Sequence, residues 1–259
     1  MKAALNCRML VLRPSWPASL LALCLLWAGA GATAQTSTPG STAAPLRVLI
    51  NDVAPYTLRG EAQRPGMHIE IMNALAQQAE LSVSLSSAVY VRLALGLKDG
   101  SADLVVGIDG PELDALAQRV TPFHSFKFVV LTRKAAGISQ VSQLRGRLLG
   151  VARGAFYDDS INKDEAIQKF PMADPFQGVR MLAVDRLDAV ISSDYLLSYA
   201  LRQTGIDPQQ FAPPFVVNEK NYSLYARRDL PDEQLRALRR AMEQLQKSGR
   251  LNAILRSYQ

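Results

Sequence analysis

The sequence predicts an α/β protein with two similar lobes, each a mainly parallel sheet flanked by helices, and a two-segment hinge between them. Short apolar runs typical of buried strands alternate with stretches of helical spacing, which indicates βαβ units. A pattern of strand, small residue and aspartate in the first half recurs in the second. Residues 126–134 and 220–227 are extended segments where the chain would cross between the lobes and return.

The first lobe begins at Leu46, where LRVLIN is a short apolar run typical of a buried strand. The next apolar residues, from Met67 to Ala79, fall at helical spacing. Gly100 ends a later helix, and Gly110-Pro111 begins another. The predicted elements are strand 46–51, helix 67–79, strand 82–85, helix 92–98, strand 103–106 and a helix from Pro111.

The second lobe repeats this alternation, and the chain then ends in helices that return to the first lobe. The clearest helix of the chain covers 232–247, with Pro231 before its start and Gly249 after its end. The predicted elements are strand 148–151, helix 158–170, helix 177–184, strand 189–191, helix 194–203, helix 232–247 and a last short helix at 250–258.

An internal echo supports two related lobes. Residues 99–109 align with residues 184–194 without a gap. In both stretches an aspartate, Asp103 or Asp188, precedes three apolar residues and a small residue, and a second aspartate, Asp109 or Asp194, ends the stretch. Ligands of open α/β sheets bind outside the carboxyl ends of the strands. Asp109 and Asp194 would then lie on opposite walls of one cleft. The alternative is a chance resemblance between short βα units.

The N-terminal segment differs from the rest. Residues 1–34 combine basic residues, an apolar core of about 14 residues and a small-residue cleavage site, the pattern of a secretory signal peptide cleaved after Ala34. The core is shorter than a membrane-spanning helix needs. Cys24 as a lipidated N-terminus is the alternative. Residues 35–45 predict a flexible tail, and the mature protein is expected to be exported.

Composition excludes several classes of function. Both cysteines, Cys7 and Cys24, lie in the leader, so the mature chain is expected to hold no disulfide or thiol site. Three of the 29 basic residues also lie there, which leaves 26 against 23 acidic residues, too mild a balance to indicate nucleic acid. His68 and His124 show no metal-ligand spacing, and surface or core roles are favoured. We expect no metal and no cofactor.

From Leu46 to Tyr258 the sequence resembles the periplasmic solute-binding proteins of ABC transporters, type II receptors of the polar amino-acid class, family 3. The resembling stretches are LRVLINDVAPY, GMHIEIMNALA, YVRLALGLKDGSADLVVG, QVSQLRGRLLGVARGAFYDD, DRLDAVISSDY and LQKSGRLNAILRSY. The resemblance implies a two-lobed type II periplasmic binding protein fold, with lobe 1 at 46–131 and 222–259 and lobe 2 at 132–221.

The function that the resemblance implies is capture of a small polar solute by hinge closure, without catalysis, and docking of the closed form on an ABC permease of the inner membrane. We expect the protein to be a monomer. Two alternatives use the same scaffold. One is a periplasmic enzyme resembling cyclohexadienyl dehydratase, and the other is a binding protein linked to a sensor.

Three positions depart from the family's amino-acid site. Leu113 stands where the family's carboxylate-binding arginine is expected. Gly154-Ala155-Phe156 replaces a Gly-Ser-Thr turn, so amide donors remain but hydroxyls are lost. Ser193 aligns with the aspartate that takes an α-ammonium group. Together these departures weaken the case for a standard α-amino acid as the ligand.

Several candidate residues keep two interpretations. Arg92 either clamps an anionic group of the solute or pairs with Asp52 or Asp109 as scaffold. Asp109 and Asp194 either face the solute or serve their helix starts. The aromatic candidates either stack on the solute or pack. The full predicted set is Asp52, Tyr56, Tyr90, Arg92, Asp109, Gly110, Gly154, Phe156, Ser193, Asp194 and Tyr195.

Overall fold

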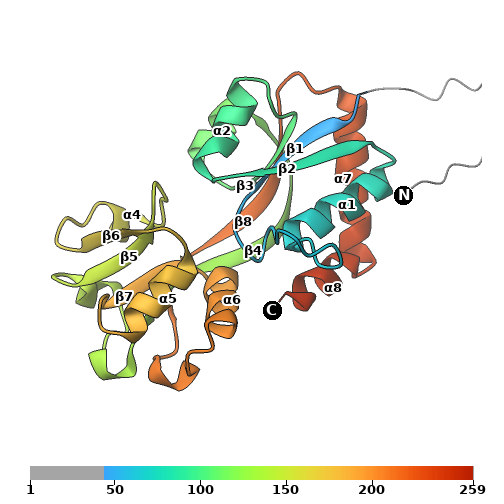
Figure 1. The fold of residues 1–259 in the computed structure, drawn as a ribbon. Coiled ribbons are helices and arrows are strands. Elements are labelled where there is room, and N and C mark those ends of the chain that lie inside the picture. Colours follow the sequence, from blue (N-terminus) through green and yellow to red (C-terminus); the bar gives the residue numbers. More distant parts are fainter. Residues whose placement is uncertain (1–43, 259) are drawn as a thin grey trace, which may run out of the picture. The chain divides into compact units, whose positions relative to one another are not determined.

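The structure is a computed structural model and describes residues 44–258 (Figure 1). The predicted signal peptide at 1–34 lies outside the described residues, as does nearly all of the predicted tail at 35–45. The described residues belong to one compact unit. Within residues 44–258, every helix is too short or too polar to cross a membrane.

The strands form one mixed sheet of eight strands in the order β2-β1-β3-β8-β4-β7-β5-β6. Three parallel strands at each end of this order make up the two halves, with β1 and β5 as the middle strands. The two long strands β4 and β8 run antiparallel between them. The bounds are β1 Leu46–Asn51, β2 Val83–Ala88, β3 Leu104–Ile108, β4 Gln118–Thr132, β5 Leu148–Ala152, β6 Gln168–Met172, β7 Ala189–Ser193 and β8 Phe215–Ala226.

Helices cover the strands of each half (Figure 1). In the first half, α1 packs on α7 and α8, while α2 packs on α3, β1 and β3; in the second half, α5 packs on α6 and β7. The bounds are α1 Met67–Ala79, α2 Val91–Lys98, α3 Pro111–Leu116, α4 Asp159–Asn162, α5 Pro175–Ala183, α6 Asp194–Thr204, α7 Asp232–Lys247 and α8 Arg250–Ser257, with short 3-10 turns at Lys134–Ala136, Val141–Leu144 and Pro208–Gln210.

The echo in the sequence corresponds to a repeated structure. The Asp103 carboxylate accepts the backbone N–H of Arg47 at 2.8 Å, while the Asp103 N–H donates to the Arg47 carbonyl at 2.9 Å. Asp188 makes the same two hydrogen bonds to Leu148, at 2.8 and 3.0 Å. Each aspartate therefore fixes the start of the strand that follows it, β3 or β7, against the beginning of the middle strand, β1 or β5.

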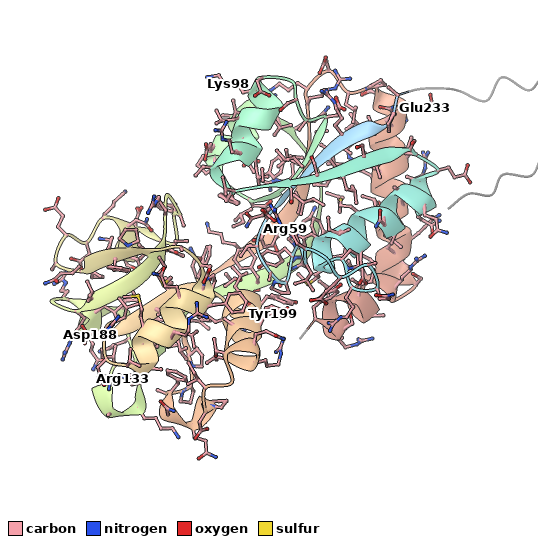
Figure 2. The ribbon with its side chains drawn as sticks, viewed as in Figure 1. Arg59, Lys98, Arg133, Asp188, Tyr199 and Glu233 are labelled. Atoms are coloured by element: carbon pink, nitrogen blue, oxygen red, sulfur yellow. The ribbon has the colours of Figure 1, made fainter. Side chains whose placement is uncertain are left out.

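We expect the two aspartates to differ in how much they stabilise the fold. The Asp103 carboxylate also binds the Arg47 guanidinium, and its side chain is 11% exposed, whereas that of Asp188 is 34% exposed (Figure 2). Asp103→Ala should lower the free energy of unfolding by about 2 kcal/mol and Asp188→Ala by about 1 kcal/mol, because a buried donor left unpaired is costly. Urea denaturation of both variants measures this difference, and an equal loss would contradict it.

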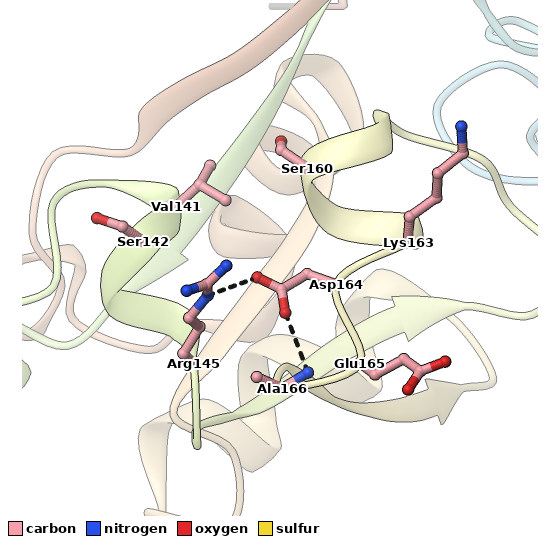
Figure 3. A pocket seen from close by; sticks show the side chains of 8 residues that line it. All are labelled: Val141, Ser142, Arg145, Ser160, Lys163, Asp164, Glu165 and Ala166. Carbon is pink, nitrogen blue, oxygen red and sulfur yellow. Dashed lines mark hydrogen bonds and ion pairs between the residues drawn. The ribbon is translucent and has the colours of Figure 1, made fainter.

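The helix predicted at 158–170 is wrong. The helix α4 ends at Asn162, and residues 168–172 form the edge strand β6 instead. Asp164 breaks the helix because its carboxylate accepts the N–H of Ala166 at 3.0 Å and binds Arg145 at 2.8 Å (Figure 3). Pro171 is tolerated because an edge strand needs fewer ladder donors.

The segments predicted to be extended, 126–134 and 220–227, lie largely in β4 and β8. The predicted helix from Pro111 is short, because β4 already begins at Gln118.

Candidate functional site

Tyr56, in the loop after β1, contacts the second half of the molecule. Its hydroxyl lies 2.9 Å from the hydroxyl of Ser193, the last residue of β7. Both side chains are buried, and burial raises the pKa of the Tyr56 phenol well above its usual value. Ser193 also accepts the N–H of Leu196 at 3.2 Å and so caps α6. The helix cap is therefore Ser193, and not Asp194 as the capping interpretation had it.

An aromatic–histidine cluster surrounds this contact. The Tyr56 and His68 rings are stacked, with centroids 4.3 Å apart and planes 5° apart. The rings of His124 and Tyr195 lie 5.5 Å apart, and Tyr222 of β8 touches both histidines. The cluster consists of Tyr56, His68, Phe123, His124, Tyr195 and Tyr222. Sequence reasoning did not include either histidine or Tyr222 in the site.

Gly154 provides a second contact between the halves. It has a φ of +72°, and a Cβ atom built there would lie 3.2 Å from Cγ1 of Val91, at the start of α2. Val91 is 53% exposed, and Phe156, two residues beyond Gly154, is 58% exposed. Each half thus presents an exposed apolar side chain at or close to this contact, Val91 from α2 and Phe156 from the loop after β5. Gly154 also lines a cavity of about 270 Å³ in the second half.

Arg92 and Tyr90 lie at the start of α2. Within residues 44–258, the exposed guanidinium of Arg92 forms no ion pair. Hydrogen bonds from Ser101, and more weakly the charge of Arg92, lower the pKa of Asp99 at the other end of α2. Burial raises the pKa of Tyr90 to about 12, while a hydrogen bond with the Ile108 backbone opposes this shift. Arg92 therefore remains available to an external anion.

The scaffold interpretation of Arg92 is wrong, because its two proposed partners bind other arginines. Asp52 forms an ion pair with Arg59 and accepts the Ser87 hydroxyl at 3.3 Å (Figure 2). Asp109 lies 3.4 Å from the Arg119 guanidinium.

Asp109 also accepts the Tyr225 hydroxyl at 3.3 Å, so its carboxylate has partners within its own half. Gly110 is the N-cap of α3, and Pro111 takes the first turn. Leu113 is buried, with its side chain under Gly107. The loop after β3 is thus ordered by internal contacts.

Asp194 retains a carboxylate without an arginine partner among the described residues. It accepts the N–H of Tyr195 at 2.9 Å, and partial burial raises its pKa above the usual carboxyl value. It lines a cavity of about 210 Å³ together with Tyr195, Ser198, Arg202 and Tyr258. A larger cavity of about 780 Å³, around Arg145 and Lys163, contains none of the predicted site residues (Figure 3).

The predicted set therefore separates into groups. Tyr56, Ser193 and Tyr195 meet in or beside the aromatic–histidine cluster. Gly154 lies beside Val91 at the start of α2, and Val91 is the sequence neighbour of Arg92. Asp52, Asp109 and Gly110 support the loops that carry them.

The family model for bacterial extracellular solute-binding proteins, family 3, matches residues 46–259. The chain belongs to this family. Relatives include the arginine-binding extracellular protein ArtP of Bacillus subtilis, 21% identical over 94% of this chain and 97% of the relative. The probable amino-acid-binding protein YxeM of the same organism is 19% identical over 79% of each chain.

Solved structures share the fold. The GluR0 ligand-binding core from Nostoc punctiforme, in complex with L-glutamate, has a TM-score of 0.70 and 16% identity, over 83% of this chain and 99% of that one. A histidine kinase sensor domain similar to periplasmic binding proteins has a TM-score of 0.72 and 17% identity, over 83% and 96%. The predicted two-lobed type II periplasmic binding protein fold is confirmed.

Proposed function

We propose that this protein is an exported receptor that captures a small polar solute between its two halves and delivers it, as a monomer, to an ABC permease of the inner membrane. The observation that carries the proposal is that residues of the two halves meet at two places, Tyr56 with Ser193 at the end of β7, and Val91 at the start of α2 with Gly154. A solute held between such loops favours the closed form and bends the connecting strands β4 and β8. In this proposal the boundaries between the lobes, after residues 131 and 221, fall within these two strands.

The proposed solute contacts divide by chemistry. Arg92 supplies a cation without an internal ion pair, and Asp194 supplies a carboxylate that lines a cavity. Phe156 and Tyr90 offer aromatic surface from opposite halves. The backbone around Gly154 offers amide donors. Asp52, Asp109 and Gly110 act indirectly, by ordering the loops that carry these groups.

The names of the relatives make amino acids the first class to test, because ArtP is named for arginine and YxeM for amino acids. Two features favour a wider panel. The hydroxyl of Ser193 is already engaged by Tyr56 and by the N–H of Leu196. Leu113 is buried in the first half. Organic acids and amines without an α-amino acid group therefore belong in the panel.

Thermal unfolding with a panel of amino acids, amines and organic acids tests the proposal. A solute at about 100 times its Kd adds about 2.7 kcal/mol to the folded state, which raises the Tm of a chain of this size by roughly 5–10 °C. Isothermal titration calorimetry then gives the Kd. No shift with any member of the panel would overturn the receptor function.

With a solute in hand, Arg92→Ala and Asp194→Asn are each expected to weaken binding by about tenfold or more, since charge-assisted hydrogen bonds are the strong ones. Lys98→Ala is the matched control, because Lys98 is an exposed cation on the same helix as Arg92 but at its far end (Figure 2). Unchanged affinity in both test variants would contradict the assignment of these residues.

A role in sensing is the second candidate, favoured by the fold shared with the histidine kinase sensor domain. Both candidates use the same binding step and differ in the partner. Uptake of the labelled solute by cells lacking the protein separates them: loss of uptake supports transport, and normal uptake supports sensing.

A further inference from the structure

The two histidines of the sequence touch each other inside the aromatic–histidine cluster. Nε2 of His68, on α1, lies 3.0 Å from Nε2 of His124, on β4. His68 is fully buried and His124 is 7% exposed. The sequence contains two histidines, so this pair accounts for all of them.

The hydrogen bonds fix which nitrogen carries each proton. Nδ1 of His124 lies 3.1 Å from the carbonyl oxygen of Ser125, which can only accept, so this nitrogen carries the proton. Nε2 of a neutral His124 is then an acceptor, and Nε2–H of His68 donates to it. Nδ1 of His68 is left as a buried acceptor without a partner among the described residues. The pair is therefore held together by one hydrogen bond between two neutral rings.

Protonation of either ring is unfavourable at both nitrogens that could accept the proton. On Nδ1 of His68 it would find no acceptor, and on Nε2 of His124 it would face the N–H of His68. Burial keeps the pKa of both imidazoles below the usual value, with the neighbouring His124 adding to the effect on His68. The titratable groups in contact are the phenols of Tyr56, Tyr195 and Tyr222, which are neutral in acid.

Asp194, at the start of α6, is the carboxylate next to this cluster. Its charge acts on Tyr56 and Tyr222, and Lys127 of β4 acts on Asp194 in turn. Among the described residues, no carboxylate raises the pKa of either imidazole.

The pair lies directly behind a contact between the halves. His68 stacks on Tyr56, whose hydroxyl binds Ser193, and the His124 ring contacts Tyr195. In the second half, Ser193 is the N-cap of α6 and Tyr195 lies in its first turn. Any separation of the two imidazoles therefore disturbs the contacts at Tyr56 and Tyr195 that connect the start of α6 to the first half. A further link, from the Arg202 guanidinium of α6 to the Tyr258 carbonyl at 2.9 Å, lies outside the pair.

We propose that the His68–His124 pair is a proton-sensitive switch: it keeps the two halves in contact while both rings are neutral and loosens that contact when it takes up a proton. The switch goes beyond the proposed function, because it sets the contact between the halves in the absence of solute.

NMR on the unaltered protein tests the protonation state. Two histidines give two ring signals, and nitrogen shifts distinguish the protonated atoms. We expect Nε2–H in His68, Nδ1–H in His124, a midpoint near 4 for His124, and a midpoint well below the usual 6.5 for His68. Independent titration of both rings near 6.5 would overturn the proposal.

Small-angle X-ray scattering tests the movement. The radius of gyration without solute should rise as the pH falls from 7.5 to 3.5, a range that includes the His124 midpoint near 4. This rise should disappear when His68→Phe and His124→Phe are combined, because both side chains stay aromatic without titrating. Asp194→Asn is the control for the neighbouring carboxylate and should keep the rise. A constant radius in the unaltered protein, or a rise that Asp194→Asn abolishes, would overturn the switch even where the double variant does not fold.

Discussion

Replacing Gly66 by alanine is expected to lower the free energy of unfolding by more than about 3 kcal/mol. Gly66 precedes α1 with φ 119° and ψ 149°, a conformation that residues with a Cβ rarely adopt. An added Cβ would lie 2.5 Å from both the Tyr56 carbonyl oxygen and the Thr57 Cα. These are backbone atoms, so no side-chain rotation relieves the clash. The loop that carries Tyr56 must move.

Gly60→Ala is the matched control. Gly60 also has a positive φ, of +82°, and its added Cβ would meet no atom within 4 Å. This variant introduces backbone strain without a steric clash, so its free energy of unfolding should fall by about 1 kcal/mol. Urea denaturation followed by circular dichroism compares the two. An equal loss of unfolding free energy in the two variants would contradict the prediction, because it would show that the loop relaxes around the new methyl group at position 66 and avoids the clash.

Local patterns predicted the long helices and most strands. The apolar spacing from Met67 to Ala79 defined α1, and that of 232–247 defined α7 with the observed bounds. Both helices are amphipathic and bury their apolar face, a property that the order of residues alone reveals. The edge strand β6 was missed because it exists only through pairing with β5, which no local spacing near 168–172 reveals.

Residues at strand ends could be selected from the sequence, whereas contacts that depend on how a helix packs on the sheet could not. Tyr56 was selected because it lies in a loop after a strand of the first half, and Ser193 because the family resemblance aligns it with a ligand-binding aspartate. Their hydroxyls lie 2.9 Å apart. His68 and His124 are 56 positions apart, on a helix and a strand, with no shared motif. Their contact depends on how α1 packs against β4, which the sequence does not display.

Acidification from pH 7 to 4 is expected to lower the free energy of unfolding by about 3 kcal/mol or more through the histidine pair. In the unfolded chain both rings have a pKa near 6.5. In the folded protein, burial lowers the pKa of His124 to about 4, with the Ser125 carbonyl opposing the shift, and lowers that of His68 well below 6.5. Between these values the unfolded chain binds more protons, so stability falls as the pH falls and is constant above about 7.

Other groups act in different directions or pH ranges. Arg47 lowers the pKa of Asp103, so the stabilisation from Asp103 is lost only below the usual carboxyl range. Burial raises the pKa of Asp194, which makes its contribution opposite in sign to that of the histidines as the pH falls.

Urea denaturation at pH 7, 6, 5 and 4, followed by circular dichroism, measures the dependence. The combined His68→Phe and His124→Phe variant should give a nearly flat profile from pH 7 to 5, since it removes both imidazoles and leaves neither one without its partner. Tyr56→Phe keeps the pair and should keep the slope, while losing the hydrogen bond to Ser193. A flat profile in the unaltered protein would mean that the folded state accepts protons on these rings as readily as the unfolded chain does, which is incompatible with a buried neutral pair.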